Sequence, residues 1–296
     1  MEIRVLRYFL AVVREENITK AAEVLHVTQP TLSRQLAQLE EEIGVKLFDR
    51  GARKITLTNA GVLLRRRAEE ILRLVDKTQE ELDAQEEQIE GEITVGCGEL
   101  ASVQLLARFI ATFQQSYPAV TYDILTETAD VVKEQMDKGL VDVGLLLEPV
   151  DMEKYDFVRL SMKERWVVLM RQDAPLAGQA AVTPQDLAGV PLILPRRLTV
   201  QSELASWFGD AFRKLNVRFT SNLSSNAAVM VDQGLGYCIC VEGFLPFWDN
   251  RRLVYRPLAP ELTATSVLAW KRNQPFSPAV AKFIQHLQYT LRMGRP

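Results

Sequence analysis

The sequence predicts an α/β protein that begins with a helical region, continues through one long helix and ends in alternating strands and helices. Three observations support this prediction. Residues 1–58 place apolar side chains at helical spacing before a short strand pair, residues 59–90 contain no Pro and only one Gly, and strand and helix patterns alternate from Gly91 onward. The length of 296 residues suits two domains of about 150 residues each.

The first residues predict an amphipathic helix with Leu6, Phe9, Leu10 and Val13 on one side. Charged residues interrupt this stretch and no small-residue cleavage site follows it, so it does not resemble a signal peptide. No apolar run approaches the length needed to span a membrane. The odd number of cysteines, three, argues against a disulfide framework and favours the cytoplasm.

Residues 18–43 predict two helices joined by a tight turn. Small and apolar side chains of the first helix share one face, and those of the second recur at spacings of four, three and four: Ala21, Ala22 and Leu25, then Leu32, Leu36, Leu39 and Ile43. Paired alanines let two helices approach closely at a steep crossing, which is the packing of a helix-turn-helix.

The second helix exposes a polar face. Thr28 is a good N-cap and Pro30 sits in the first turn, where its missing N–H costs little. The opposite face carries short donors and acceptors and one guanidinium, which can read base edges and bind phosphates: Gln29, Thr31, Ser33 and Arg34. Taken alone, the segment could also be a helical hairpin inside a larger core, with a solvated Arg34.

The next segment predicts a basic hairpin. Two short strands surround a Gly51-Ala52 turn, with four apolar side chains able to face the helices: Leu47, Phe48, Ile55 and Leu57. Arg50, Arg53 and Lys54 cluster near the tip. A basic hairpin beside a recognition helix forms a wing, which is placed to touch the DNA backbone or minor groove.

The run ITKAAEVLHVTQPTLSRQLAQLEEEIGVKLFDR, followed by RKITLTNAG, closely resembles the winged helix-turn-helix of LysR-type transcriptional regulators. The resemblance implies an N-terminal winged helix-turn-helix, a long linker helix and a C-terminal two-lobed, periplasmic-binding-protein-like domain. It also implies DNA contacts from seven residues: Gln29, Pro30, Thr31, Ser33, Arg34, Arg50 and Arg53. The corresponding ranges are 1–58, 59–90 and 91–296.

Charge is distributed unevenly along the chain. Residues 1–67 contain 12 Lys and Arg against 8 Asp and Glu, a net charge of +4, whereas the remainder contains 23 and 30, a net charge of −7. Only the N-terminal part therefore suits a polyanion such as double-stranded DNA.

The long helix carries a thin apolar stripe, too sparse for a globular core and typical of a helix-helix seam: Leu64, Ile71, Leu74, Val75, Leu82 and Ile89. A lone surface helix is the alternative. In the resembled family this helix dimerises the DNA-binding domains, so we expect a homodimer or homotetramer.

Residues 91–296 alternate strand and helix, which predicts parallel sheets with crossover helices. About 200 residues are many for one sheet and favour two lobes with a cleft. The resemblance implies that the chain crosses between lobes twice, and we expect the crossings near residues 161 and 267. Lobe I then contains 91–161 and 267–296, and lobe II contains 162–266.

In open parallel sheets, ligands bind beyond the carboxyl ends of strands and near helix N-termini. This rule predicts a cleft for a small polar effector lined by eight residues: Cys97, Gly98, Glu99, Ser102, Arg196, Thr199, Ser225 and Asn226. Arg196 and Arg197 could clamp a carboxylate or be solvated, and helix capping alone could explain Ser224 and Ser225. Glu99 would repel a simple anion, which favours a ligand that also carries an amine or hydroxyl groups.

No pattern in the sequence indicates an enzyme, a cofactor or a metal site. Gly234 and Gly236 follow a helix, whereas a dinucleotide fingerprint follows a strand. Cys238 and Cys240 are expected to be buried small hydrophobes, and Cys97 could be a reactive thiol. The leading hypothesis is a DNA-binding regulator. The alternative is a solute-binding protein without a DNA role, against which the absence of a signal peptide and the basic N-terminal part both count.

Overall fold

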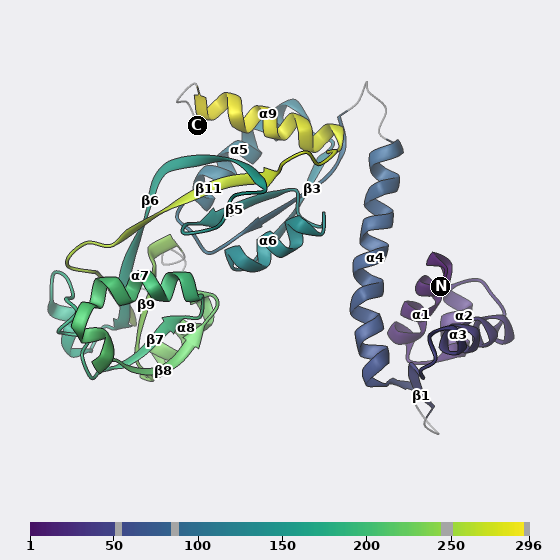
Figure 1. Cartoon of the computed structure of the whole chain (residues 1–296), viewed down its shortest axis with the longest axis horizontal. Helices are drawn as coiled ribbons and strands as arrows, with labels where there is room; N and C mark the ends of the chain where they lie inside the picture. The colour runs from purple at the N-terminus through teal and green to yellow at the C-terminus, as the bar shows by residue number, and fades with distance from the viewer. Residues whose placement is uncertain (51–54, 84–88, 244–250, 293–296) are drawn as a thin grey trace. The chain divides into compact units, whose positions relative to one another are not determined.

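The computed structural model describes residues 1–50, 55–83, 89–243 and 251–292. The chain forms two compact units, Met1–Asp83 and Ala84–Pro296 (Figure 1). Wing residues 51–54, including Arg53, lie outside the described residues, and so does the side chain of Arg50.

The N-terminal unit is a helical bundle with a two-stranded hairpin. Its elements are α1 (Ile3–Glu15), α2 (Ile18–Val24), α3 (Gln29–Ile43), β1 (Phe48–Arg50), β2 (Ile55–Leu57) and α4 (Asn59–Asp83). The strands pair antiparallel, as predicted for the hairpin.

The turn between α2 and α3 has the predicted packing. The Asn17 side chain caps α2 by accepting a hydrogen bond from the Lys20 amide at 3.1 Å. Ala21 and Ala22 are 0% and 2% exposed, so their methyl groups allow the helices to approach closely. His26 in the turn adopts a φ of 54°, and the next amide, of Val27, donates back to the Ala22 carbonyl at 3.0 Å.

Two details of the apolar faces differ from the prediction. The buried face of α1 is made by Val5, Leu6, Phe9 and Val12, so it is rotated away from Leu10 and Val13, which are only partly buried. Ile43 is 38% exposed and does not extend the buried stripe of α3. The reason is that α3 ends at Ile43, where Gly44 turns the chain with a φ of 72°.

The sequence suggested that the apolar stripe of α4 has too few packing partners in its own chain. In the structure, part of this helix packs against the N-terminal unit. Ala68 and Leu72 are buried in the core of the N-terminal unit, and Leu64 and Ile71 pack against that core. The Asp76 carboxylate also pairs with Arg7 of α1 at 2.5 Å. Among the α4 residues whose side chains are described, Val62, Leu63 and Leu74 are exposed, at 57%, 55% and 36%. The side chain of Leu82, which the sequence placed in the stripe, lies outside the described residues.

The C-terminal unit alternates strands and helices. Its first elements are β3 (Gly91–Cys97), α5 (Val103–Ser116), β4 (Val120–Thr126), α6 (Ala129–Asp137), β5 (Val143–Leu147) and β6 (Tyr155–Arg171). The next are the 3₁₀ helix η1 (Pro175–Gly178), β7 (Pro191–Pro195), α7 (Leu198–Phe208), the 3₁₀ helix η2 (Gly209–Lys214), β8 (Asn216–Ser221) and α8 (Ser224–Asp232). The last are β9 (Tyr237–Val241), β10 (Leu253–Pro257), β11 (Thr263–Lys271) and α9 (Pro278–Arg292).

Two lobes share the long strand β6. The strands follow the order β4-β3-β5-β11-β6-β9-β7-β8, and β10 also pairs with β6. Residues 155–165 of β6 pair with β11, and residues 166–171 pair with β9 and β10. The chain therefore leaves lobe I near residue 165 and returns near residue 263. Lobe I and lobe II are used below with these bounds.

Each lobe buries both faces of its sheet. In lobe I, α5 and α9 contribute Phe109, Phe113 and Phe283 to one core, and α6 contributes Val132 and Met136 to another. In lobe II, α7 covers one face and α8 the other. Strands covered on both sides read as continuous apolar runs, as β5 does.

The helix α7 begins at Leu198 and ends at Phe208, because Gly209, with a φ of 54° and a ψ of −131°, breaks it before η2. The sequence reading missed the antiparallel strands β10 and β11.

Among the described residues, no helix is both long enough and apolar enough to cross a membrane.

Candidate functional site

The outer face of α3 presents the predicted polar residues. Gln29, Pro30 and Arg34 are exposed, and Thr31 and Ser33 are partly buried. Within the described part of the chain, Arg34 has neither an ion pair nor a hydrogen bond that would hold its guanidinium on the protein surface. Its donors are therefore available to a partner.

The start of α3 leaves its backbone amides uncapped. Thr28 is the N-cap residue, but its hydroxyl pairs with the Thr31 hydroxyl at 2.8 Å instead of capping the helix. Uncapped amides at a helix N-terminus carry partial positive charge and suit a phosphate.

The hairpin is held close to the start of α4. A Cβ on Gly61 would lie 2.2 Å from the Leu47 carbonyl oxygen, so only glycine permits this approach. Thr58 adds two hydrogen bonds, donating its hydroxyl to Lys46 O at 2.7 Å and accepting from the Gly61 amide at 3.0 Å. The base of the wing is therefore fixed relative to the helices.

Glu40 anchors the wing to α3, a role that the sequence reading missed. Its side chain accepts hydrogen bonds from the amides of Leu47 at 2.7 Å and Phe48 at 3.3 Å, and Lys46 pairs with it at 3.0 Å. Burial acts to raise the pKa of this carboxyl, but these bonds outweigh it and the pKa is lowered. The signal was a glutamate within the apolar stripe of α3, one residue after Leu39.

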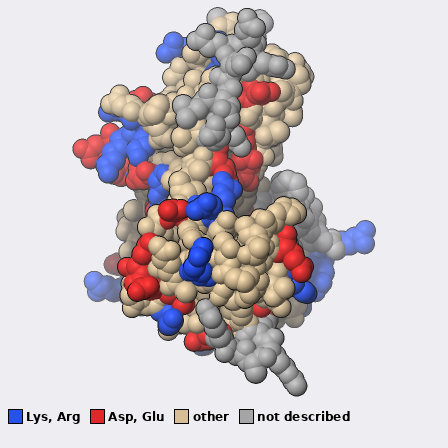
Figure 2. All heavy atoms as spheres, turned by 90° about the vertical axis from the view of Figure 1, so that its right-hand side faces the viewer, with Lys and Arg blue, Asp and Glu red and all other residues tan. Residues whose placement is uncertain are grey.

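Figure 2 turns the view of Figure 1 by 90° and shows Lys and Arg side chains interspersed with acidic and uncharged ones on that face.

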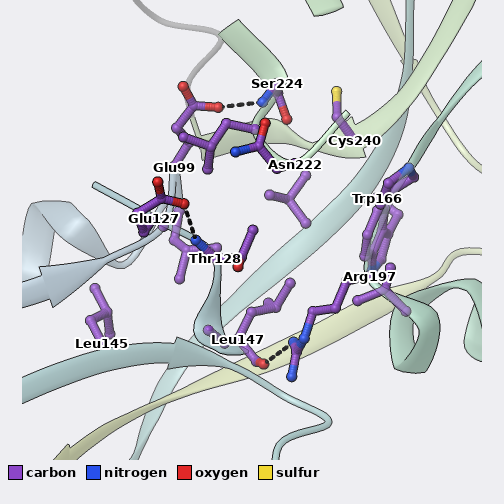
Figure 3. A pocket seen from close by; sticks show the side chains of 17 residues that line it. Glu99, Glu127, Thr128, Leu145, Leu147, Trp166, Arg197, Asn222, Ser224 and Cys240 are labelled. Atoms are coloured by element: carbon purple, nitrogen blue, oxygen red, sulfur yellow. Dashed lines mark hydrogen bonds between the residues drawn. The ribbon is translucent and has the colours of Figure 1, made fainter. Parts of the chain in front are cut away.

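A cavity of about 90 Å³ lies between the two lobes of the C-terminal unit. Both lobes line it, through Gly98, Glu99, Leu100, Glu127, Thr128, Ala129, Leu145 and Leu147 from lobe I and Trp166, Pro195, Arg197, Val200, Asn222, Leu223, Ser224, Cys240 and Val241 from lobe II. Figure 3 shows this arrangement. The volume suffices for several waters or one small molecule.

Glu99 crosses the cleft. Its Oε2 accepts hydrogen bonds from the backbone amides of Ser224 at 2.6 Å and Ser225 at 3.1 Å, which form the first turn of α8 in the other lobe. Figure 3 shows the first of these contacts. The N-terminus of α8 is thus occupied by a carboxylate of the protein itself.

Arg197 crosses the cleft in the opposite direction. From the N-cap of α7 it reaches lobe I, where its guanidinium donates to Leu147 O at 2.8 Å, Pro149 O at 2.6 Å and Asp130 Oδ1 at 3.0 Å. The side chain is 8% exposed. Figure 3 shows the Glu99 and Arg197 contacts at opposite ends of the cavity.

The predicted effector residues are only partly brought together. Gly98 and Glu99 line the cavity, but six others do not: Cys97, Ser102, Arg196, Thr199, Ser225 and Asn226. Arg196, Thr199 and Asn226 are exposed. The cavity is lined instead by residues that include Glu127, Trp166 and Asn222, which are not among the eight predicted from the sequence.

Ser102 is fully buried and has a structural role. Its hydroxyl donates to the Glu164 carboxylate at 2.6 Å and accepts from the Ser266 hydroxyl at 2.8 Å. Glu164 also accepts from the amides of Ala101 at 2.8 Å and Ser102 at 3.0 Å. This buried carboxylate of β6 therefore fixes the start of α5 where the chain passes between lobes, and Ser102 is unavailable to an effector.

The three cysteines are buried and free. Burial raises the pKa of the Cys97 thiol, which keeps it protonated and argues against the reactive role considered from the sequence. The thiol of Cys240, which lines the cavity, has a raised pKa because it hydrogen bonds with Cys238 and is buried. The described residues contain no group of three or more His, Cys, Asp and Glu that could hold a metal ion.

Comparisons with known proteins agree with both parts of the chain. Residues 3–62 match the family model "Bacterial regulatory helix-turn-helix protein, lysR family", and residues 86–292 match "LysR substrate binding domain". The "Hca operon transcriptional activator HcaR" of Escherichia coli (strain K12) is 31% identical, over 98% of each chain. The "HTH-type transcriptional regulator BudR" of Raoultella terrigena is 29% identical, over 96% of this chain and 99% of that protein.

A solved structure shares the fold. The crystal structure of full-length CbnR complexed with its target DNA superposes with a TM-score of 0.74, at 23% identity, over 98% of this chain and 100% of that one. The matching relatives are regulators of transcription, and this protein is likewise a regulator and not an enzyme. The chain therefore belongs to the LysR family of bacterial transcriptional regulators, with a DNA-binding helix-turn-helix and an effector-binding domain.

Proposed function

We propose that this regulator binds duplex DNA in the cytoplasm as a homodimer or a homotetramer, and that a small polar molecule between the lobes alters this binding. The observation that carries the proposal is the cavity lined by both lobes, which Glu99 and Arg197 span from opposite sides. A molecule in such a cavity touches both lobes and can favour one lobe arrangement over another. Only differential affinity for two arrangements shifts an equilibrium.

The DNA contacts proposed for α3 rest on exposure and available donors. Gln29 and Arg34 are exposed on α3, and the uncapped amides at its start suit a phosphate. Arg34 can contact a guanine edge or a phosphate, and Gln29 an adenine edge. Arg50 and Arg53 of the wing remain proposed contacts to the backbone or minor groove.

The proposed dimer uses an exposed face of α4. Leu63 and Leu74 are eleven residues apart, which is close to three helical turns, so they lie on the same face. They are 55% and 36% exposed, whereas Ala68 and Leu72 face the core of the same unit. A long exposed helix with apolar residues on one outer face is suited to pairing with a second copy.

Salt-dependent binding to its operator tests the proposal. The protein should bind operator DNA with an affinity that falls steeply as salt rises, because Lys and Arg release counterions from the phosphates. Recovering DNA fragments bound in cells would supply the operator, and genes beside them would suggest candidate effectors. A protein that binds no DNA but binds a small molecule would instead support a solute-binding function.

A further inference from the structure

The helix α8 takes its N-terminal cap from the other lobe. Its own N-cap residue, Leu223, has no side chain that can accept a hydrogen bond. Glu99 provides the missing acceptor, at 2.6 Å from the Ser224 amide and 3.1 Å from the Ser225 amide. A carboxylate at a helix N-terminus receives charge-assisted hydrogen bonds and a favourable helix dipole. Glu99 therefore holds the position in which a carboxylate ligand would bind.

The remaining charges of the cavity are unfavourable to an anion. Arg197 is the cationic residue in the lining, and each of its three guanidinium nitrogens already has a partner in lobe I. Glu127 adds a second carboxylate, which accepts a 3.3 Å hydrogen bond from the adjacent Thr128 amide. An anion in this cavity would meet two carboxylates and a guanidinium whose donors are already directed at Asp130 and two carbonyl oxygens.

The Glu127 carboxylate of the lining offers acceptors for N–H or O–H groups of a ligand. Trp166 contributes to the wall of the cavity; it is 3% exposed, and its indole Nε1 is enclosed by the protein. The lining thus complements a molecule with N–H or O–H donors.

We propose that Glu99 is a built-in carboxylate ligand of the cleft, and that the cleft therefore takes a neutral or cationic small molecule with N–H or O–H donors and rejects carboxylates. The proposal rests on the proposed function, in which the cleft is the effector site. Glu99 is then the residue that determines this specificity, because a carboxylate ligand would have to displace it from α8.

Chemical rescue tests the first half of the proposal. Glu99→Ala removes a CH₂ and a carboxylate, which together match the size and charge of acetate. The full-length variant should melt about 2 to 4 °C below the wild type, as expected for loss of a cap in a domain of this size. Sodium acetate should restore most of this loss in a saturable way, against sodium chloride at equal ionic strength.

The matched controls are Glu127→Ala and Glu99→Gln. Glu127→Ala removes a carboxylate from the same cavity whose hydrogen bond stays within its own loop, so acetate should not stabilise it. Glu99→Gln fills the space and keeps an acceptor, so it should fold and also show no acetate response. The proposal is overturned if acetate raises the melting temperature of the wild type as much as that of Glu99→Ala. It is also overturned if acetate leaves the melting temperature of Glu99→Ala unchanged.

The indole N–H signal of Trp166 in a ¹⁵N–¹H spectrum tests the second half without any destabilising variant. In the wild type, ethanolamine should shift this signal and acetate should not. A shift with acetate, or none with ethanolamine, contradicts the stated ligand class. Neither experiment involves DNA, so a negative result in either would contradict the proposed ligand class and not the proposed DNA binding. Failure of the proposed function would instead appear as absent operator binding.

Discussion

Arg197 of lobe II ends inside lobe I, where its Nε donates to Asp130 Oδ1 at 3.0 Å and its Nη1 to the Leu147 carbonyl at 2.8 Å. At the other end of the cavity, Glu99 of lobe I accepts two amide hydrogen bonds from lobe II. The lobes are therefore tied twice, by opposite charges reaching in opposite directions. A molecule that binds between the lobes must therefore fit beside these two contacts or displace them.

Arg197→Met should loosen the lobes. The change leaves two partly buried backbone carbonyls, of Leu147 and Pro149, without this donor, which costs about 1 to 3 kcal/mol of the free energy of unfolding of the C-terminal unit. Denaturant unfolding of the full chain measures it. The neighbouring Arg196→Ala is the control, since Arg196 is exposed and outside the cavity, and its effect should stay within about 0.5 kcal/mol. Equal effects of the two changes would argue against the tie.

Arg34→Ala should weaken operator binding by about 1 to 3 kcal/mol if the guanidinium contacts a base edge, and should relax the preference at that base. Fluorescence anisotropy with the operator and with single-base variants measures both effects. Arg292→Ala removes the same charge from the last helix of the C-terminal unit and should leave the affinity unchanged. An Arg34 variant with wild-type affinity would remove this residue from the interface.

The double change Leu63→Asp and Leu74→Asp should convert dimers into monomers, because it places charges on the exposed apolar face of α4. Sedimentation velocity measures the change in mass. Val229→Asp on α8, where Val229 is 46% exposed, is the control for adding charge at an exposed apolar position. Persistence of the wild-type mass in the double variant would locate the dimer seam elsewhere. Ile71 is left unchanged in this test because it packs against the core of its own unit.

The N-terminal unit should lose stability in acid through Glu40. The folded-state pKa of this carboxyl is lowered from its ordinary value of 4.5. Its stabilisation is therefore fully present above about pH 4.5 and is lost as the pH falls through the lower, folded-state value. The measurement is the free energy of unfolding of the N-terminal unit in the wild type and in Glu40→Gln, between pH 3 and 7.

At neutral pH, Glu40→Gln should destabilise the unit by about 1 to 3 kcal/mol, since the charged acceptor of two amides is lost. The difference between the two proteins should shrink in acid. Glu41→Gln, an exposed neighbour on α3, is the control and should have little effect. A difference that does not change with pH would mean that ionisation of Glu40 does not contribute.

The sequence by itself determined the N-terminal unit and the alternation of the C-terminal one. Ala21, Ala22 and the stripe from Leu32 to Leu39 follow a local period, and the buried strands follow continuous apolar runs, so neighbours in sequence specify them. The start of α3 at Thr28 and the wing strands were predicted for the same reason. Local patterns also predicted a cleft, since strand ends and helix starts recur at fixed places.

Only the tertiary structure decided what occupies that cleft. Glu99 and Ser224 are 125 residues apart, and no local pattern reveals that one caps the helix of the other. The same holds for Ser102, whose partner Glu164 lies 62 residues away on the strand shared by the lobes. Neither helix start is capped by the side chain of its own N-cap residue, since Leu223 cannot accept a hydrogen bond and Ser102 makes no cap hydrogen bond. The partner of each is chosen by long-range packing, because a buried amide or carboxylate must be satisfied by whichever group the fold brings within hydrogen-bond distance.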